Sequence, residues 1–392
     1  MQFSSRMDYF KPGIFSVLAQ MRAKRTAEGL PVVDLSVGTP NIPPAQHIVD
    51  ALVCSAQDRC NYAYAIDDTD KLRQAVAQWY QRRYGVALDP AHEITSLLGS
   101  QDGLAHIAFT VIDEGDTILI PDPCYPIFKD GPVLAGAQPY MMPQKKETGY
   151  LIDVRDIPRV VAERAKMMIV SYPNNPTASV APDSLYRDVI AFAREYNIVV
   201  VHDNSYSELT FDGHCCGSFL RHPGAKAVGI EFNSLSKTYG LAGARIGFAV
   251  GNPAVIGKLK ALKSNIDYGM FLPLQDAAIA AITGPQDCVA ATRAQYQARR
   301  DLLVDGLGKL GWAIHKSPAT MFLWARLPEG YTDSVAFTRA LFETSGVLMT
   351  PGTAFGAQGE GHVRIALVAD QNELTNAIRL IETSGILKAH SA

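Results

Sequence analysis

The feature that most constrains the fold of this chain is the alternation of apolar, β-branched runs with helical patterns through its middle. Runs rich in Val, Ile and Met, each about as long as one strand, lie at residues 93–98, 117–121, 138–142, 166–172, 198–202, 227–233 and 246–250. Helical patterns such as 104–112 and 184–196 lie between them. This alternation predicts an α/β fold with a mostly parallel seven-stranded sheet that helices cover on both faces.

The length and the later part of the chain predict a second, smaller domain. A chain of 392 residues is longer than one compact domain usually is. From about residue 297 the pattern changes to a helix and short strands near 321–326 and 362–366. We therefore predict a large domain over residues 46–290 and a smaller α+β domain over 291–392. Residues 1–45 are predicted to form an N-terminal arm that packs with the smaller domain or reaches a partner subunit.

Composition argues against several classes of protein. The formal net charge of -3 offers no surface for nucleic acid. No run of about 18 apolar residues predicts a membrane span, and the first residues lack the apolar segment of a signal peptide. The six cysteines are scattered without metal-ligand spacing, so reduced thiols and a cytoplasmic location are expected, with no metal site.

The segment 234–248 carries the strongest chemical signal in the chain. Lys237 follows Ser234 and Ser236 closely and is followed by Arg245. A lysine amine can form a Schiff base with an aldehyde. The two hydroxyls and the guanidinium are suitable donors to a dianionic phosphate. An enzyme needs these groups to hold pyridoxal 5'-phosphate at both its aldehyde and its phosphate.

This segment resembles the lysine signature of the class I/II aminotransferases, which are fold-type I pyridoxal-phosphate enzymes. Further motifs stand in the order typical of that family, at 98–104 (LGSQDGL), 121–126 (PDPCYP), 171–177 (SYPNNPT) and 203–206 (DNSY). The resemblance extends over roughly residues 30–385. It implies a ping-pong transfer of an amino group between an L-amino acid and a 2-oxo acid, with pyridoxal phosphate as the cofactor.

The resemblance assigns cofactor contacts to individual residues of these motifs. Ser100 and Gln101 contact the phosphate, and the ring of Tyr125 stacks on the pyridine. Asn175 and Tyr206 donate hydrogen bonds to the ring 3-oxygen. Asp203 ends an apolar run and faces the pyridine nitrogen, where its charge favours the protonated ring that accepts electrons. Asp102 is expected to cap a helix and not to bind phosphate.

The same resemblance implies a catalytic base, a substrate clamp and a shared site. Lys237, once released, acts as general base, assisted by Asp203 and Tyr206. Arg364 binds the substrate α-carboxylate through its bidentate guanidinium, close to Asn175 and to the backbone of Gly38. Tyr64 matches a tyrosine that reaches the phosphate of the other subunit, which implies a homodimer with shared active sites.

The strings at 61–64, 99–106 and 263–271 are most similar to those of the LL-diaminopimelate aminotransferase group. That similarity implies LL-diaminopimelate and 2-oxoglutarate as substrates. Alanine or aspartate aminotransferases, and a pyridoxal-phosphate lyase on the same fold, are the alternatives. One departure from the family pattern bears on specificity, because Ala244 replaces a large aromatic beside Arg245. Lys263 and Arg22 are candidates to bind a distal carboxylate.

Overall fold

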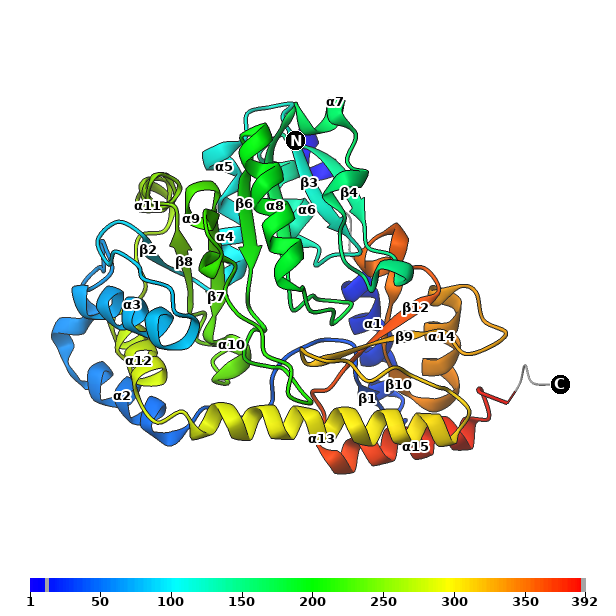
Figure 1. The fold of residues 1–392 in the computed structure, drawn as a ribbon. Helices are drawn as coiled ribbons and strands as arrows, with labels where there is room; N and C mark the ends of the chain where they lie inside the picture. The colour runs from blue at the N-terminus through cyan, green and yellow to red at the C-terminus, as the bar shows by residue number, and fades with distance from the viewer. Residues whose placement is uncertain (11–13, 389–392) are drawn as a thin grey trace.

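In the computed structural model, which describes residues 1–10 and 14–388, a seven-stranded sheet forms the centre of the larger part of the molecule (Figure 1). Its spatial order is β2-β8-β7-β6-β5-β3-β4. The strands are β2 Ile94–Leu97, β3 Thr117–Asp122, β4 Gln138–Pro143, β5 Ala165–Ser171, β6 Val199–Asp203, β7 Gly229–Ser234 and β8 Gly247–Gly251. Strand β8 runs antiparallel to both neighbours, and the other pairs are parallel. The predicted α/β fold with a mostly parallel sheet is confirmed.

Helices cover both faces of this sheet, and each face has its own apolar core. Leu104, Phe128 and Ile256 pack on one face, and Val76 and Val189 belong to the core on the other. The helices of this part are α2 Gln46–Gln57, α3 Asp70–Tyr84, α4 Ser100–His106, α5 Ala108–Val111, α6 Ile127–Leu134, α7 Arg159–Ala162, α8 Asp183–Tyr196, α9 Ala225–Val228, α10 Leu235–Thr238, α11 Pro253–Ile266 and α12 Leu272–Thr283. Burial on both faces explains why the central strands read as continuous apolar runs.

Local sequence explains where the helices begin and end. Helix α3 begins after Thr69, whose hydroxyl accepts a hydrogen bond from the Leu72 amide, and it ends at Gly85 in the left-handed conformation (φ 68°). A hydroxyl N-cap and a left-handed glycine satisfy the end groups of a helix, so the local sequence marks both ends of α3. The pattern at 104–112 is a pair of helices, α4 and α5, and α4 already begins after Gly99 (φ 81°).

The fully buried carboxylate of Glu231 links β6 and β7 through hydrogen bonds. Glu231 on β7 accepts hydrogen bonds at 2.8–3.0 Å from Tyr80 Oη, His202 Nδ1, Asn204 Nδ2, Ser218 Oγ and the Phe219 amide. A buried carboxylate is stable only when its oxygens are satisfied in this way. Because His202 and Asn204 flank Asp203, the network also fixes the end of β6.

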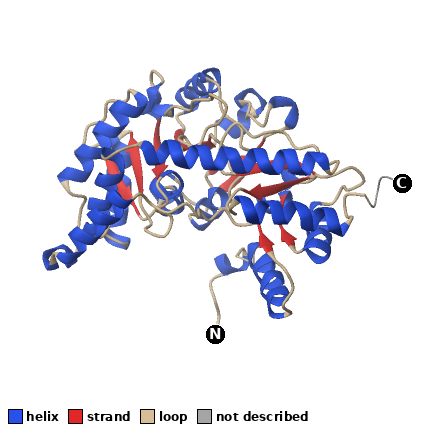
Figure 2. Ribbon diagram, turned by 90° about the horizontal axis from the view of Figure 1, so that it is seen from below, coloured by secondary structure: helices blue, strands red, loops and turns tan. Residues whose placement is uncertain are grey.

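The C-terminal part of the chain forms a second body around a small antiparallel sheet of order β11-β12-β9. Its core is a separate cluster that includes Leu323, Phe337 and Ile365. The strands are β9 Phe322–Arg326, β10 Val347–Leu348, β11 Thr350–Pro351 and β12 His362–Ala366, and the helices are α13 Asp287–Lys309, α14 Ser334–Ser345 and α15 Gln371–Ser384. Figure 2 shows, from below, a long helix crossing from one group of strands to the other.

The long helix α13 crosses residue 290, so the predicted domain boundary falls inside a continuous helix. The pattern predicted a helix only from 297, because the first turns are rich in alanine and polar residues, although Val289, Thr292 and Tyr296 are buried there. The N-terminal segment packs on the second body: β1, Val33–Asp34, pairs in parallel with β10, and α1, Ile14–Ala27, packs Leu18 against Phe342. The division at residues 45 and 290 stays a prediction.

Among residues 1–10 and 14–388, none of the helices is both long enough and apolar enough to cross a membrane.

Candidate active site

A cavity of about 500 Å³ lies where the parallel strands end and the β9–β12 sheet approaches them. It collects all the predicted site residues except Tyr64, although they come from motifs far apart in the sequence. The lining residues are Val37, Gly38, Thr39, Pro40, Ser100, Gln101, Leu104, Tyr125, Asn175, Asp203, Ser205, Tyr206, Ser234, Ser236, Lys237, Ala242, Gly243, Arg245, Phe322 and Arg364. Carboxyl ends of parallel strands are the usual place for ligand sites in such sheets.

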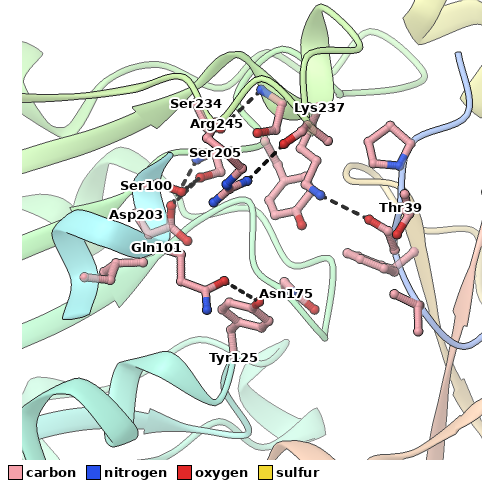
Figure 3. A pocket seen from close by; sticks show the side chains of 18 of the residues that line it. Thr39, Ser100, Gln101, Tyr125, Asn175, Asp203, Ser205, Ser234, Lys237 and Arg245 are labelled. Atoms are coloured by element: carbon pink, nitrogen blue, oxygen red, sulfur yellow. Dashed lines mark hydrogen bonds between the residues drawn. The ribbon is translucent and has the colours of Figure 1, made fainter. Parts of the chain in front are cut away.

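Lys237 projects into this cavity from α10, the short helix that follows β7 (Figure 3). Its Nζ donates a hydrogen bond to the carbonyl of Gly38 at 3.1 Å. Burial, together with the positive charges of Arg364 and Arg245, lowers the pKa of Lys237 from 10.5 to about 8. A substantial fraction of the amine is therefore neutral near physiological pH and is able to act as a nucleophile or base.

Asp203 is delivered to the cavity by the C-terminal end of β6. Burial raises the pKa of its carboxyl, and the hydrogen bond from Ser205 acts against that rise. Ser205 Oγ donates to Asp203 Oδ1 at 2.6 Å and lies 3.2 Å from Ser100 Oγ, so the two hydroxyls connect the carboxylate to α4 (Figure 3). A cationic ring nitrogen against Asp203 would stabilise the ionised carboxylate.

The donors predicted to hold a phosphate lie together at one end of the cavity. Arg245 reaches the start of α4 so closely that a Cβ on Gly99 would lie 2.8 Å from its Cζ. Gly99 has φ 81°, and Arg245 itself has φ 56°, a conformation that side chains other than glycine rarely adopt. Ser234 caps α10 by accepting from the Ser236 amide at 3.2 Å. Hydroxyls, a guanidinium and a glycine cradle suit a phosphate group.

Arg364 is held rigidly at the other side of the cavity. It lies on β12, is 3% exposed, and its guanidinium carbon lies 4.1 Å from the ring centre of Phe322 and 4.5 Å from that of Phe355. Its nitrogens donate to Asn175 Oδ1 at 2.9 Å and to the Ser36 carbonyl at 2.8 Å. Burial lowers the pKa of Arg364 to about 10, so the group stays charged at neutral pH.

Tyr125 and Tyr206 also line the cavity. Tyr125 donates from its hydroxyl to Gln101 Oε1 at 3.0 Å (Figure 3). Tyr206 is 5% exposed and packs edge-on against Phe322, with ring centres 5.9 Å apart. Burial raises the pKa of both phenols, so each hydroxyl is protonated and available as a donor at neutral pH.

Tyr64 does not line the cavity in the isolated chain. Its side chain is 84% exposed and contacts Tyr268, with ring centres 5.9 Å apart. Its predicted contact with the other subunit's phosphate stays a prediction.

The structure gives three charged residues partners outside the cavity. Lys263 does not line the cavity; it is 5% exposed and pairs with Asp102 and with Asp267 at 2.8 Å. Arg22 pairs with Asp34 at 2.7 Å and does not line the cavity. Asp102 stays out of the cavity as expected, but it does not cap α4.

Asp102 Oδ2 instead accepts from the Leu98 amide at 2.9 Å, and Oδ1 lies 2.7 Å from His106 Nδ1. These contacts tie β2 to α4. The side chain of Ala244 packs against the core of the large sheet and not into the cavity, so the substitution of the usual aromatic changes the support behind Arg245.

Sequence reasoning missed several residues of the site. Ser205 lies in the DNSY motif at 203–206 but was given no role. A hydroxyl two residues after a strand-end carboxylate is well placed to donate a hydrogen bond to that carboxylate. Phe322 and Phe355 carried no chemical signal, because an aromatic in an apolar strand or loop reads as core. Their function as the walls of the Arg364 site depends on tertiary contact alone.

The lysine, strand-end carboxylate and phosphate-type donors are those of a pyridoxal-phosphate enzyme of fold-type I. Residues 31–381 match the family described as Aminotransferase class I and II. The chain therefore belongs to this family and is an aminotransferase that uses pyridoxal phosphate and acts on amino acids and 2-oxo acids.

Individual relatives agree with this assignment. The LL-diaminopimelate aminotransferase of Moorella thermoacetica is 45% identical over 96% of this chain and 97% of its own length. That of Halothermothrix orenii is 40% identical over 98% and 99%. Among solved structures, substrate-bound BacF from Bacillus subtilis superposes with a TM-score of 0.94 at 35% identity, covering 98% of each chain. A probable N-succinyldiaminopimelate aminotransferase from Thermus thermophilus has a TM-score of 0.89 at 34% identity, covering 94% and 99%.

The residues present fit the cofactor. A Cβ on Gly247 would lie 2.8 Å from the Ser100 amide nitrogen, so glycine at 247 lets β8 pack closely against the start of α4, where the phosphate donors lie. Lys237 and Asp203 supply the amine and carboxylate that the aldehyde and the ring nitrogen require.

Proposed function

We propose that this chain is an LL-diaminopimelate aminotransferase that passes the amino group to 2-oxoglutarate by a ping-pong mechanism. The observation that carries the proposal is the placement of Lys237, with its lowered pKa, in one cavity with Asp203 and Arg364. The named relatives support the substrate, since this chain matches them over almost its whole length.

The proposed cofactor contacts divide between the two ends of the cavity. Pyridoxal phosphate, when bound, supplies an aldehyde that carries the amino group and a ring that accepts electrons. Ser100, Gln101, Ser234, Ser236 and Arg245 hold the phosphate. Asp203 would keep the ring nitrogen protonated, Tyr125 would pack against the ring, and Asn175 and Tyr206 would donate hydrogen bonds to the ring oxygen.

The substrate is oriented by its α-carboxylate. Arg364 binds this group with its planar guanidinium, and Asn175 and the Gly38 backbone lie beside it. Phe322 and Phe355 fix the plane of the guanidinium, so the carboxylate fixes the direction of the Cα–H bond. Lys237, as a neutral amine, would then take the proton from the substrate Cα and hold it at Nζ for return.

We infer that the enzyme is a homodimer whose subunits share their active sites. Apolar side chains that are 39–84% exposed gather around Tyr64, and they are Tyr62, Tyr64, Ile66, Tyr268 and Phe271. Tyr62 contacts Phe271 with ring centres 5.4 Å apart, so the patch is contiguous. An aromatic patch of this kind marks a protein interface. We also propose that the enzyme is cytoplasmic. Its domains are proposed to divide at residues 45 and 290.

A comparison of substrates tests the proposed reaction. We expect kcat/KM with LL-diaminopimelate and 2-oxoglutarate to exceed the values with aspartate and with alanine by at least tenfold. Glutamate should form in equal amount to the substrate consumed. A higher kcat/KM with aspartate or alanine would overturn the substrate, and release of carbon dioxide or ammonia without glutamate would overturn transamination in favour of a lyase.

Mixed dimers test the shared site. A Lys237→Ala chain and a Tyr64→Ala chain are each expected to have little activity alone. If Tyr64 serves the partner's site, their heterodimer contains one complete site, and activity should return to between a quarter and a half of wild type after mixing and subunit exchange. If Tyr64 serves its own chain, or if no dimer forms in light scattering, no activity returns and the proposal is wrong.

A further inference from the structure

A second cavity, of about 760 Å³, lies beside the active site at the junction of the two sheets. One wall is formed by Thr177 and its loop, two residues after Asn175. The opposite wall includes His362, two residues before Arg364 on β12. In Figure 1 this is where the loop that follows β4 approaches β9 and β12. Nothing in the proposed transamination uses this cavity.

Five of the side chains that line this cavity are basic. Lys146, Arg326, His214, His315 and His362 line it, and no carboxylate is among its lining residues. Within residues 1–10 and 14–388, neither Lys146 nor Arg326 forms an ion pair, although the other acids and bases of this chain often do. Two cations without an ion-pair partner in the described part of the chain therefore line one space, Lys146 from the loop after β4 and Arg326 from the end of β9, and both side chains are exposed.

The acidic residues closest in sequence do not neutralise the cavity. Glu360 uses its carboxylate to accept from the amides of Ser334 and Gly361, at 2.8 and 2.7 Å. Glu147 neighbours Lys146 but does not line the cavity. Burial lowers the pKa of His362 and the charges of Arg326 and Lys146 lower it further, whereas the hydrogen bond with the Glu360 carbonyl and the charge of Glu360 act against that shift.

The inner wall is ordered and holds a polar atom without a partner. The rings of Trp324 and His362 stack in parallel, with centres 5.0 Å apart and planes at 5°. His362 Nε2 lies 3.0 Å from the hydroxyl of Tyr150, which fixes the ring from the other wall. Ser317 is 5% exposed, lines the cavity, and its Oγ makes no hydrogen bond within the described part of the chain. A buried hydroxyl that faces a cavity usually has a ligand or a water to bond.

We propose that this cavity binds a small polyanion that carries two or more carboxylate or phosphate groups. One anionic group pairs with Lys146 and the other with Arg326, while the hydroxyl of Ser317 bonds an oxygen of the ligand. Guanidinium and ammonium groups bind such oxygens through charge-assisted hydrogen bonds. Two anchors on different elements select a ligand with more than one anionic group over a single carboxylate. This site is independent of the identity of the amino-acid substrate.

Calorimetric titration of the holoenzyme tests the site, with citrate and inorganic pyrophosphate as probes and acetate as the single-charge control. We expect saturable binding of at least one polyanion and none of acetate. Preference for citrate or for pyrophosphate identifies the ligand group as carboxylate or phosphate. Lys146→Ala and Arg326→Ala should each raise Kd about tenfold, since each removes one charged contact.

Two control variants separate this site from other anion binding. Lys309→Ala removes an exposed lysine on α13 and should leave Kd unchanged. Arg364→Ala removes the active-site cation and should also leave Kd within about twofold. The proposal is overturned if no polyanion binds saturably, or if Arg364→Ala abolishes binding that Lys146→Ala and Arg326→Ala leave intact.

Discussion

Replacing Arg364 with lysine should separate the geometry of the carboxylate clamp from its charge. The lysine keeps a positive charge, but it cannot make two parallel hydrogen bonds or fill the space between two phenyl rings. In the present structure the guanidinium carbon lies 4.1 and 4.5 Å from those ring centres, and the group is 3% exposed. The substitution therefore loses one charge-assisted bond and the fixed orientation of the other.

A charged hydrogen bond contributes about 1.5–3 kcal/mol, and misorientation adds to its loss. We expect the barrier measured by kcat/KM to rise by about 2–4 kcal/mol, which is about a 30- to 900-fold loss. The assay is steady-state transamination of the preferred amino acid, with Arg339→Lys, an exposed arginine on α14, as the matched control.

A substrate analogue without the α-carboxylate sharpens this test. Wild type and Arg364→Lys should process the corresponding amine at equally low rates, because the clamp has nothing to bind. A kcat/KM within threefold of wild type on the amino acid would refute the assigned role. So would an equal loss on the amino acid and on the amine, since that pattern indicates general damage to the site.

Other predictions concern protonation, packing and the cofactor end of the cavity. Because the pKa of Lys237 is about 8, the rate at which apoenzyme recaptures pyridoxal phosphate should rise with pH and reach half its maximum near pH 8; a midpoint near 10.5 would contradict the burial argument. Glu231→Gln should destabilise the fold by about 2–4 kcal/mol and lower Tm by several degrees, whereas exposed Glu343→Gln should not. Gly99→Ala should weaken cofactor binding at least tenfold, because its Cβ meets a guanidinium 2.8 Å away. Gly85→Ala, with similar positive φ and nothing within 4 Å, should cost stability alone, and equal cofactor affinity in the two variants would refute the cradle.

The strands of the large sheet could be predicted from sequence because burial on both faces makes each of them a continuous apolar run. Strands such as β5 and β6 consist almost wholly of buried apolar residues, so composition alone locates them. Helix α3 was predictable for a local reason as well, since its hydroxyl cap and its terminal glycine stand at its two ends. The start of α13 was not, because alanine and polar residues dominate its first turns and one of the three side chains buried there, Thr292, is polar.

The residues of the candidate site also differ in whether the sequence alone could identify their roles. Lys237 and Arg245 share one short segment, so their chemistry could be recognised locally. The role of Lys263 could not, because its partner Asp102 is distant in sequence and the pair forms only when α11 packs beside α4. The same holds for Phe322 and Phe355 around Arg364. Residue type suggested the chemical groups, and tertiary packing decided which of them face the cavity.

The central claim is that Lys237 moves the proton at the substrate Cα. The most direct measurement is exchange of the Cα proton for deuterium, followed by NMR, when the amino acid is incubated with holoenzyme in D₂O without an acceptor oxo acid. The account predicts exchange by wild type and a loss of at least 1000-fold in Lys237→Ala, with partial rescue by added methylamine. Undiminished exchange in Lys237→Ala, with the cofactor still bound, would contradict it.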